Sequence, residues 1–320
     1  TALGLADGAP RWSVDYVADL GAKAPEYGFG STPRVADGRL VVQAGGGERS
    51  ILGLDPATGE VAWSHPGSPP GYASPVALEL AGARQVVVLD GARILGLVAR
   101  TGEILWEHAL GERGGADSGV ATPIDGERFC AYVGGQLAAF RVGRSGDAWT
   151  VEELYRSREL GRSYATPVAL GGHVYGFNSD FLTCVDAATG KRVWKSRPPG
   201  GRGLIAVDDH LAVFGAEGVL ALVRATPDGY EEAASVEALE FTGYTWPSFA
   251  GGRVYLRNSA ELACVELTAG DTAVPAAIAA APAPAHAFGR FVRSVEAAPD
   301  PAARRALVDE FLARHEPTPI

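Results

Sequence analysis

The sequence predicts an all-β fold built from repeated, four-stranded antiparallel units. One phrase occurs three times, as ILGLDPATGEVAW at 51–63, ILGLVARTGEILW at 94–106 and LTCVDAATGKRVW at 182–194. Polar and apolar residues alternate between the turns, which is the pattern of half-buried strands. A repeat of roughly forty residues indicates an array of like units, and each unit must stack on its neighbours to bury its apolar faces.

Each unit carries a hairpin turn that ends in glycine. In 186–190 the Asp side chain can accept backbone N–H groups, and the glycine can adopt the positive φ that reverses the chain. A tryptophan follows five of these turns: Trp12, Trp63, Trp106, Trp149 and Trp194. Because the residue recurs at one register, we expect each indole to cover the seam between two units and to bond backbone through its N–H. Aromatic platforms for a ligand would have no reason to recur in every unit.

A second marker, a small residue or Trp followed by proline, opens the first strand of most units. It occurs at Pro33, Pro75, Pro123, Pro167 and Pro247. The markers divide the chain into units at 32–63, 74–106, 122–149, 166–194, 204–236 and 246–267, and the last of these has no Trp-bearing fourth strand. Four short antiparallel strands per unit of about 40–45 residues is the composition of a β-propeller blade.

The phrase at 52–63 and 184–194 resembles the tryptophan-docking repeat of the PQQ-like β-propellers, and the resemblance extends over about residues 1–268. That superfamily contains quinoprotein dehydrogenases and also non-enzymatic propellers similar to the outer-membrane assembly lipoprotein BamB. The present chain resembles the BamB-like branch. The resemblance implies a rigid scaffold at the periplasm or cell surface, and the repeat alone does not imply the quinone cofactor.

The unit count predicts about six and a half blades in 1–268, from a propeller truncated at its N-terminus whose intact ring has eight. A ring of six or seven blades, closed by a strand from 2–15, is the alternative. An Ala/Pro-rich linker is expected at 269–287. Apolar residues then recur at helical spacing, so 288–320 is predicted to form a short α-helical tail that leads into a further domain.

Catalytic machinery is not evident in the sequence. A quinoprotein dehydrogenase, the alternative function, holds PQQ above a Ca²⁺ that is bound by Glu, Asn and Asp side chains, usually beside a disulfide of adjacent cysteines. The two asparagines, Asn178 and Asn258, occupy turn positions, and no two cysteines are adjacent. Cys130, Cys184 and Cys264 are expected to be buried free thiols. No His, Cys or carboxylate spacing predicts a metal site, and we expect neither PQQ nor calcium as a cofactor.

The remaining candidate site is a binding surface at the mouth of the central channel. Residues just before each first strand are expected there: Tyr27, Phe29, Tyr72, Ser118, Arg162, Tyr164, Arg202, Tyr244 and Trp246. Aromatic residues interspersed with arginines suit contact with a protein or peptide partner. Packing of these tyrosines within the loops themselves is an equally good interpretation. An accessory role in a larger multidomain enzyme is a third functional hypothesis, suggested by the C-terminal tail.

The net charge of −10 disfavours nucleic acid as a partner. No stretch approaches the ~18 apolar residues of a transmembrane helix. The chain opens within a strand and without Met, so we expect it to be a fragment from which the signal region is absent. Three unpaired thiols argue against an oxidising compartment, whereas the family resemblance favours the periplasm or cell surface. We expect a monomer.

Overall fold

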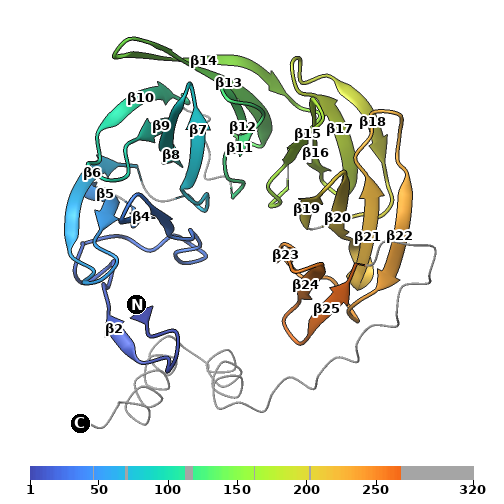
Figure 1. The fold of residues 1–320 in the computed structure, drawn as a ribbon, viewed down its shortest axis with the longest axis horizontal. Helices are drawn as coiled ribbons and strands as arrows, with labels where there is room; N and C mark the ends of the chain where they lie inside the picture. The colour runs from blue at the N-terminus through green and yellow to red at the C-terminus, as the bar shows by residue number, and fades with distance from the viewer. Residues whose placement is uncertain (46, 69–70, 112–117, 162, 202, 268–320) are drawn as a thin grey trace.

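The computed structural model describes residues 1–267, except 46, 69–70, 112–117, 162 and 202. The expected linker at 269–287 and tail at 288–320 lie outside these residues. Antiparallel sheets follow one another around a central hollow, with the chain running from blue to orange in Figure 1. The prediction of a β-propeller with four-stranded blades is therefore confirmed. No helix in the described part of the chain is long and apolar enough to span a bilayer.

The described residues contain five complete blades, numbered here in chain order. Blade 1 has β3 (Arg34–Ala36), β4 (Arg39–Gln43), β5 (Gly47–Leu54) and β6 (Val61–Gly67), and blade 2 has β7 (Val76–Leu80), β8 (Ala83–Leu89), β9 (Arg93–Leu97) and β10 (Ile104–Ala109). Blade 3 has β11 (Thr122–Pro123), β12 (Arg128–Val133), β13 (Gln136–Ser145) and β14 (Ala148–Ser157). Blade 4 has β15 (Val168–Leu170), β16 (His173–Asn178), β17 (Phe181–Asp186) and β18 (Arg192–Ser196). Blade 5 has β19 (Gly203–Val207), β20 (His210–Phe214), β21 (Val219–Arg224) and β22 (Glu232–Glu237), with the 3₁₀ turn η1 (Ala216–Gly218) before β21.

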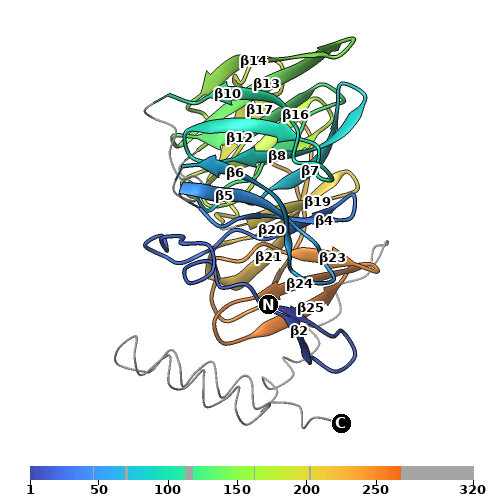
Figure 2. The same cartoon turned by 90° about the vertical axis from the view of Figure 1, so that its left-hand side faces the viewer.

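Two smaller sheets stand at the ends of the array. Blade 6 has three strands, β23 (Ser248–Ala250), β24 (Arg253–Arg257) and β25 (Leu262–Glu266), and the N-terminal hairpin has two, β1 (Ala2–Leu3) and β2 (Pro10–Trp12). Within the described residues, these are two separate sheets. The alternative of a six- or seven-bladed ring requires a strand from 2–15 to pair with blade 6, and no such pairing is present among these residues. Figure 2 views the ring edge-on, with the hairpin at its lower end.

The hydrophobic core lies between the blades, because each central strand has two apolar faces. Val86 and Val88 of β8 pack in a cluster with blade 1, whereas Val87 and Leu89 pack in a cluster with blade 3. Successive side chains of a strand point to opposite faces, so this alternation follows from the strand conformation. Burial of each such side chain stabilises the fold by about 1.5–3 kcal/mol.

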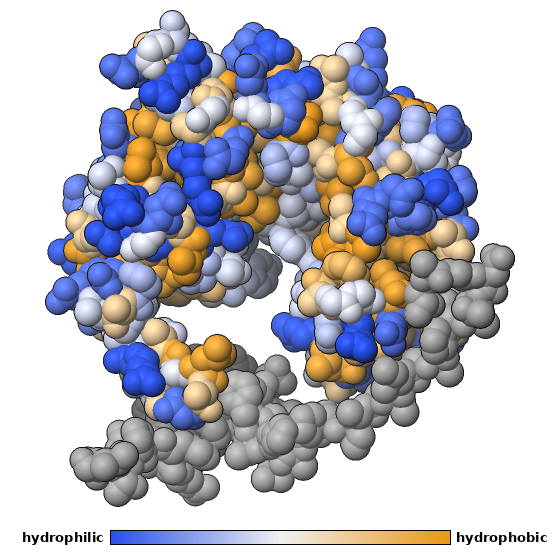
Figure 3. Space-filling model, in the orientation of Figure 1, coloured by the Kyte–Doolittle hydropathy of each residue, from blue (hydrophilic) through white to orange (hydrophobic). Residues whose placement is uncertain are grey.

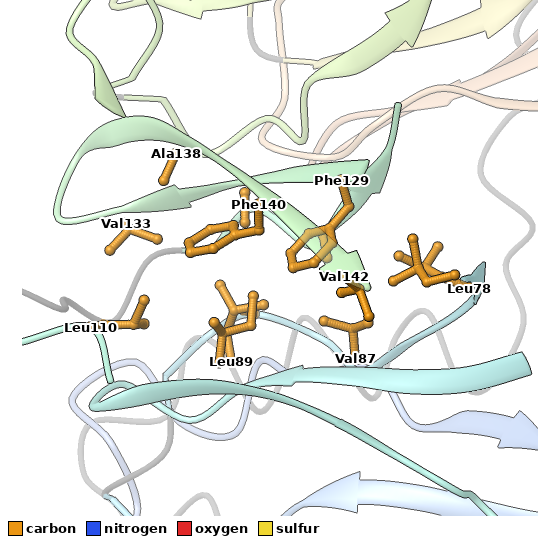
Figure 4. Packing of buried hydrophobic residues seen from close by; sticks show 14 of the residues in the cluster. Leu78, Val87, Leu89, Leu110, Phe129, Val133, Ala138, Phe140 and Val142 are labelled. Atoms are coloured by element: carbon orange, nitrogen blue, oxygen red, sulfur yellow. The ribbon is translucent and has the colours of Figure 1, made fainter. Parts of the chain in front are cut away.

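The contact between blades 2 and 3 shows the packing in detail (Figure 4). Val87 and Leu89 face Phe129 and Phe140, which are fully buried and stack with ring centroids 5.2 Å apart. The Trp106 ring stacks on Phe129 from the side, at 5.9 Å. The same arrangement of two apolar sheet faces recurs between blades 4 and 5 and between blades 5 and 6.

A second set of contacts closes the outer seam between blades. The Trp12 indole N–H donates to the carbonyl oxygen of Pro56 at 3.0 Å, and the Trp63 indole N–H donates to that of Ala99 at 2.9 Å. Each acceptor lies in the glycine-ended turn of the next blade. The Trp194 N–H makes the corresponding bond to Thr226 at 2.8 Å. These three residues therefore lie as the sequence predicts.

Glycine is required where the Trp63 ring rests. A Cβ built on Gly102 would lie 2.6 Å from the Trp63 ring, and Gly102 also has a φ of +79°. Within its own blade, Trp63 pairs with Gly53 across the β5–β6 ladder, and a Cβ on Gly53 would lie 2.2 Å from the ring. The indole is thus held between a glycine of its own blade and a turn glycine of the next one.

Trp149 departs from the expected pattern: it packs against the apolar cluster between blades 2 and 3, but it does not occupy the register position of Trp63. In blade 1, Trp63 of the fourth strand pairs with Gly53 of the third strand. In blade 3, the corresponding position of the fourth strand is occupied by Tyr155, which pairs with Ala139. The Tyr155 hydroxyl donates to the carbonyl oxygen of Ala187 at 3.1 Å and so replaces the indole N–H. Blade 3 has ten-residue strands β13 and β14, which place Trp149 farther out, beneath the Arg144 guanidinium.

Trp106 also departs from the expected pattern in one respect. Its ring covers the seam onto Phe129, but its N–H donates to the side-chain oxygen of Gln85 in its own blade. The long β13–β14 hairpin explains the difference: its turn glycine, Gly146, has no atom near its ideal Cβ position, so no ring rests on it.

We expect Gly102→Ala to destabilise the protein by about 2–4 kcal/mol, because the new methyl group adds a steric clash with Trp63 to the strain of a positive φ. Gly82→Ala is the matched control, since Gly82 has a φ of +73° and open space around it. The control isolates the backbone strain of about 1–2 kcal/mol. Urea denaturation followed by circular dichroism measures the unfolding midpoint of each variant. Equal midpoints for Gly102→Ala and Gly82→Ala would show that the Trp63 ring adds no steric clash at Gly102.

Trp63→Phe is expected to cost about 1–3 kcal/mol, because the hydrogen bond to Ala99 and part of the buried ring surface are lost. Trp149→Phe should cost about 0.5 kcal/mol, because the Trp149 ring is only partly buried against the cluster between blades 2 and 3. Thermal unfolding of the two variants compares them directly. A loss for Trp149→Phe as large as that for Trp63→Phe would contradict the assignment of the seam position to Tyr155.

The three cysteines are free, and two are buried as expected, whereas Cys264 is only half-buried. Burial raises the pKa of Cys130 to about 12, and burial is also the main reason why the pKa of Cys184 is raised to about 12. At pH 8 these two thiols remain protonated and unreactive. We therefore expect a disulfide reagent to modify one thiol, Cys264, in the native protein and three thiols in denaturant. Rapid modification of Cys130 in the native state would contradict this burial.

Candidate functional site: the loops at the mouth of the ring

The candidate site is built from connection loops, defined here as the segments that link the outer strand of one blade to the inner strand of the next. The four strands of a blade are antiparallel and consecutive, so the second-to-third-strand turns lie at the same end of the blade as these loops. The glycine-ended turns that receive the tryptophans lie at the opposite end. Figure 3 shows the hollow in the middle of the ring around which the loops are arranged.

Hydroxyl groups tie neighbouring connection loops together. The Thr32 N–H donates to Ser74 Oγ at 2.8 Å, and the Thr122 hydroxyl donates to the carbonyl oxygen of Pro167 at 2.9 Å. The Val120 N–H bonds Thr166 Oγ1 at 3.3 Å. The Ser/Thr-Pro marker of the sequence therefore has a structural role, which is to fix each inner strand to the start of the next.

Two tyrosine pairs stand on these tied loops. Tyr27 and Tyr72, from the loops before β3 and β7, have ring centroids 6.0 Å apart, and the Tyr27 N–H donates to the Tyr72 hydroxyl at 3.3 Å. Tyr164 and Tyr244, from the loops before β15 and β23, meet edge to face at 6.2 Å. We call these the tyrosine pairs. Tyr27, Tyr164 and Tyr244 are 69–79% exposed, which is unusual for large aromatic residues.

The second pair spans an intervening blade. Blade 5 lies between the blades that supply Tyr164 and Tyr244, and its connection loop carries Gly200, Gly201 and Gly203 but no aromatic residue. A Cβ on Gly203 would lie 3.0 Å from the Trp246 backbone. Because this loop is small, the two tyrosines can meet across it.

The other candidates have mixed surroundings. Phe29 is half-buried against Tyr16, at 5.2 Å, and Tyr72 is half-buried beneath Tyr27, so these rings pack the loops. The Ser118 hydroxyl donates to the carbonyl oxygen of Tyr164 at 3.3 Å and positions that loop. Trp246 is 38% exposed. Arg162 and Arg202 lie outside the described residues.

Two cavities open near this end of the molecule. The first, of about 400 Å³, lies between the N-terminal hairpin and blade 1, and its lining includes Trp12, Tyr16, Phe29, Leu40 and Val42. Burial there raises the pKa of Tyr16. The second, of about 780 Å³, lies at the seam between blades 3 and 4, and it is lined by Gly134, Gly135, Gln136, Arg158, Gly161 and Asn178.

Arg158 is a candidate that the sequence reasoning missed. It follows the outer strand β14 directly, whereas the expected site residues precede the inner strands. The signal that could have identified it is the concentration of glycines, at 134, 135 and 161, on both sides of one seam.

The residues expected at a quinoprotein centre serve other purposes. The Asn178 amide donates to the carbonyl oxygens of Arg158 and Glu159, at 2.9 and 3.1 Å. The Asn258 amide donates to the carbonyl oxygen of Phe241 at 2.9 Å, and its oxygen accepts two backbone N–H groups. No three His, Cys, Asp or Glu side chains gather as a metal site within the described ranges. Both asparagine side chains are therefore engaged by bonds within the loops.

Comparisons with known proteins agree with this architecture. Residues 1–196 match the model of the PQQ_2 family, described as outer membrane protein assembly factor BamB. No curated protein sequence matches the chain. Among solved structures, BamB from Moraxella catarrhalis is similar with a TM-score of 0.62 and 22% identity, over 83% of this chain and 75% of that one. The C-terminal WD40 domain of Sif2 has a TM-score of 0.51 and 9% identity, over 74% of this chain and 66% of that one.

The two structural similarities show the propeller fold alone, whereas the family match covers more than half of the sequence. It includes the N-terminal hairpin and blades 1 to 4, with the glycine-ended turns and the rings that rest on them. The chain therefore belongs to the PQQ_2 family, the family of outer membrane protein assembly factor BamB.

Proposed function

We propose that this protein is a non-enzymatic scaffold that binds a protein or peptide partner on its connection loops. The observation that carries the proposal is the pair of exposed tyrosines, Tyr164 and Tyr244, which come from two blades and stand on loops held by hydrogen bonds. Aromatic side chains that are exposed and already positioned lose little conformational entropy on binding, and they are enriched at the energetic centres of interfaces.

The family match supports a protein partner, because the family's description names an assembly factor for outer membrane proteins. It also supports a periplasmic or cell-surface location for this chain, and we propose a monomer there. The engagement of Asn178 and Asn258 within loops favours the scaffold over a quinoprotein dehydrogenase. Titration with PQQ and Ca²⁺, read by the absorbance of the bound quinone, tests that alternative, and stoichiometric binding would refute the scaffold proposal.

A phage-displayed library of random twelve-residue peptides, selected on the immobilised 320-residue chain, tests the proposed surface. Selected peptides are then synthesised and their affinities measured by fluorescence anisotropy. We expect Tyr164→Ala with Tyr244→Ala to weaken binding at least tenfold, because two ring contacts are lost. Val193→Ala, which removes an exposed apolar side chain from β18 of blade 4, is the matched control and should leave affinity unchanged.

Two results would count against the proposal. Peptides that bind the double variant as tightly as the parent protein would place binding elsewhere. A selection in which no peptide sequence is enriched more strongly on the immobilised protein than on the support alone would indicate that the loops do not recognise peptides.

A further inference from the structure

The cavity at the seam between blades 3 and 4 is formed mainly by backbone. Gly134 and Gly135 form the turn between β12 and β13, and Gly161 packs so closely on it that a Cβ would lie 2.1 Å from the Gly135 oxygen. Gly161 also forms a parallel bridge with Asn178. Because these glycines carry no side chains, the space of about 780 Å³ stays open.

Among the residues that the structure describes, Arg158 is the charged one that lines this space. Its side chain is exposed, and it makes no ion pair among the described residues. The neighbouring Glu159 does not compete for it, since that carboxylate bonds Arg192 at 3.2 Å. The Asn178 amide donates a hydrogen bond to the carbonyl oxygen of Arg158 at 2.9 Å. This bond fixes the position of the Arg158 backbone, from which the guanidinium extends. In a chain with a net charge of −10, an unpaired arginine in a cavity is a notable feature.

The topology relates Arg158 to the tyrosine pair. Arg158 follows the outer strand β14, and Tyr164 lies on the same loop just before the inner strand β15. Six residues separate Arg158 from Tyr164 along the chain, so their Cα atoms lie at most about 20 Å apart. An extended peptide rises about 3.4 Å per residue, so a segment of up to about six residues covers that distance.

Resting on the proposed function, we infer that the partner presents a carboxylate to Arg158 and a large apolar or aromatic side chain to Tyr164 and Tyr244, within about six residues of each other. The planar guanidinium donates two parallel hydrogen bonds that match a carboxylate. The carboxylate can come from an Asp or Glu side chain or from a chain terminus.

The same selection tests the inference, with Arg158→Ala and Arg158→Lys as additional targets. Peptides selected on the parent protein should share an acidic residue within about six positions of an aromatic or large apolar residue. Arg158→Ala should weaken their binding about tenfold, as expected for loss of a charge-assisted hydrogen bond. Arg158→Lys should bind more tightly than Arg158→Ala but less tightly than the parent protein, since lysine keeps the positive charge and lacks the two parallel N–H donors of the guanidinium. Arg141→Ala, at an exposed arginine on β13 with no ion pair among the described residues, is the control.

Synthetic peptides separate the two sources of the carboxylate. Replacing the acidic residue by Asn or Gln should weaken binding to the parent protein about tenfold and should not weaken binding to Arg158→Ala further. A shortened peptide that ends at this position is tested as the free acid and as the amide. Tighter binding of the free acid would show that a terminal carboxylate also fits, and equal binding would restrict the site to side chains.

Failure of this inference is distinguishable from failure of the proposed function. Peptides that depend on Tyr164 and Tyr244 but show no acidic preference, or that bind Arg158→Ala within twofold of the parent, would overturn the carboxylate site and leave the loop surface intact. Peptides that depend on neither the tyrosines nor Arg158 would overturn both. The melting temperature of each variant is measured first, so that a loss of binding is compared among folded proteins only.

Discussion

Each sheet of this molecule has two apolar faces, and a sheet cannot cover either face by itself. Val86 and Val88 turn to one neighbour while Val87 and Leu89 turn to the other, so blade 2 depends on both. The same constraint explains why the core is divided among several seams and why the blades form a continuous array. Blade 6 shows what happens where a neighbour is lacking among the described residues: Tyr255 is 36% exposed, whereas Tyr175, at the same register in blade 4, is fully buried.

The rings at the outer seams add geometric precision to this packing. Trp63 reaches a carbonyl oxygen of the next blade and lies between two glycines, so it fixes both the distance and the angle between blades 1 and 2. Tyr155 shows that the requirement is for a large ring with a donor at its far end, and not for tryptophan itself. A seam can also use another solution, as the bond from Trp106 to Gln85 demonstrates.

The sequence was sufficient to predict the fold because strand alternation, turn glycines and ring positions all repeat. Repetition also caused the misassignment of Trp149, which follows its turn glycine by three residues, whereas Trp63 and Trp194 follow theirs by four. The extra length of β13 and β14 shifts the register, and strand length cannot be read from the spacing of one Gly and one Trp. For the site, position before an inner strand correctly predicts that Tyr164 and Tyr244 lie on the loops. Their mutual contact across blade 5 depends on the ring geometry, and the sequence does not show it.

The division between seams and loops has a functional consequence. Most apolar side chains that hold the blades together lie within the sheets, and the connection loops add buried anchors such as Leu160 to them, so exposed loop residues can change without disturbing this packing. The segment from the end of β14 to β15 illustrates this separation. Leu160 is fully buried, and the Ser157 hydroxyl donates to the carbonyl oxygen of Gly190. Arg158 and Tyr164, in the same segment, are exposed. Alternate residues of one short segment therefore anchor the scaffold and face the solvent. A protein built in this way can change its partner by changing exposed loop residues, without altering the packing on which its fold depends.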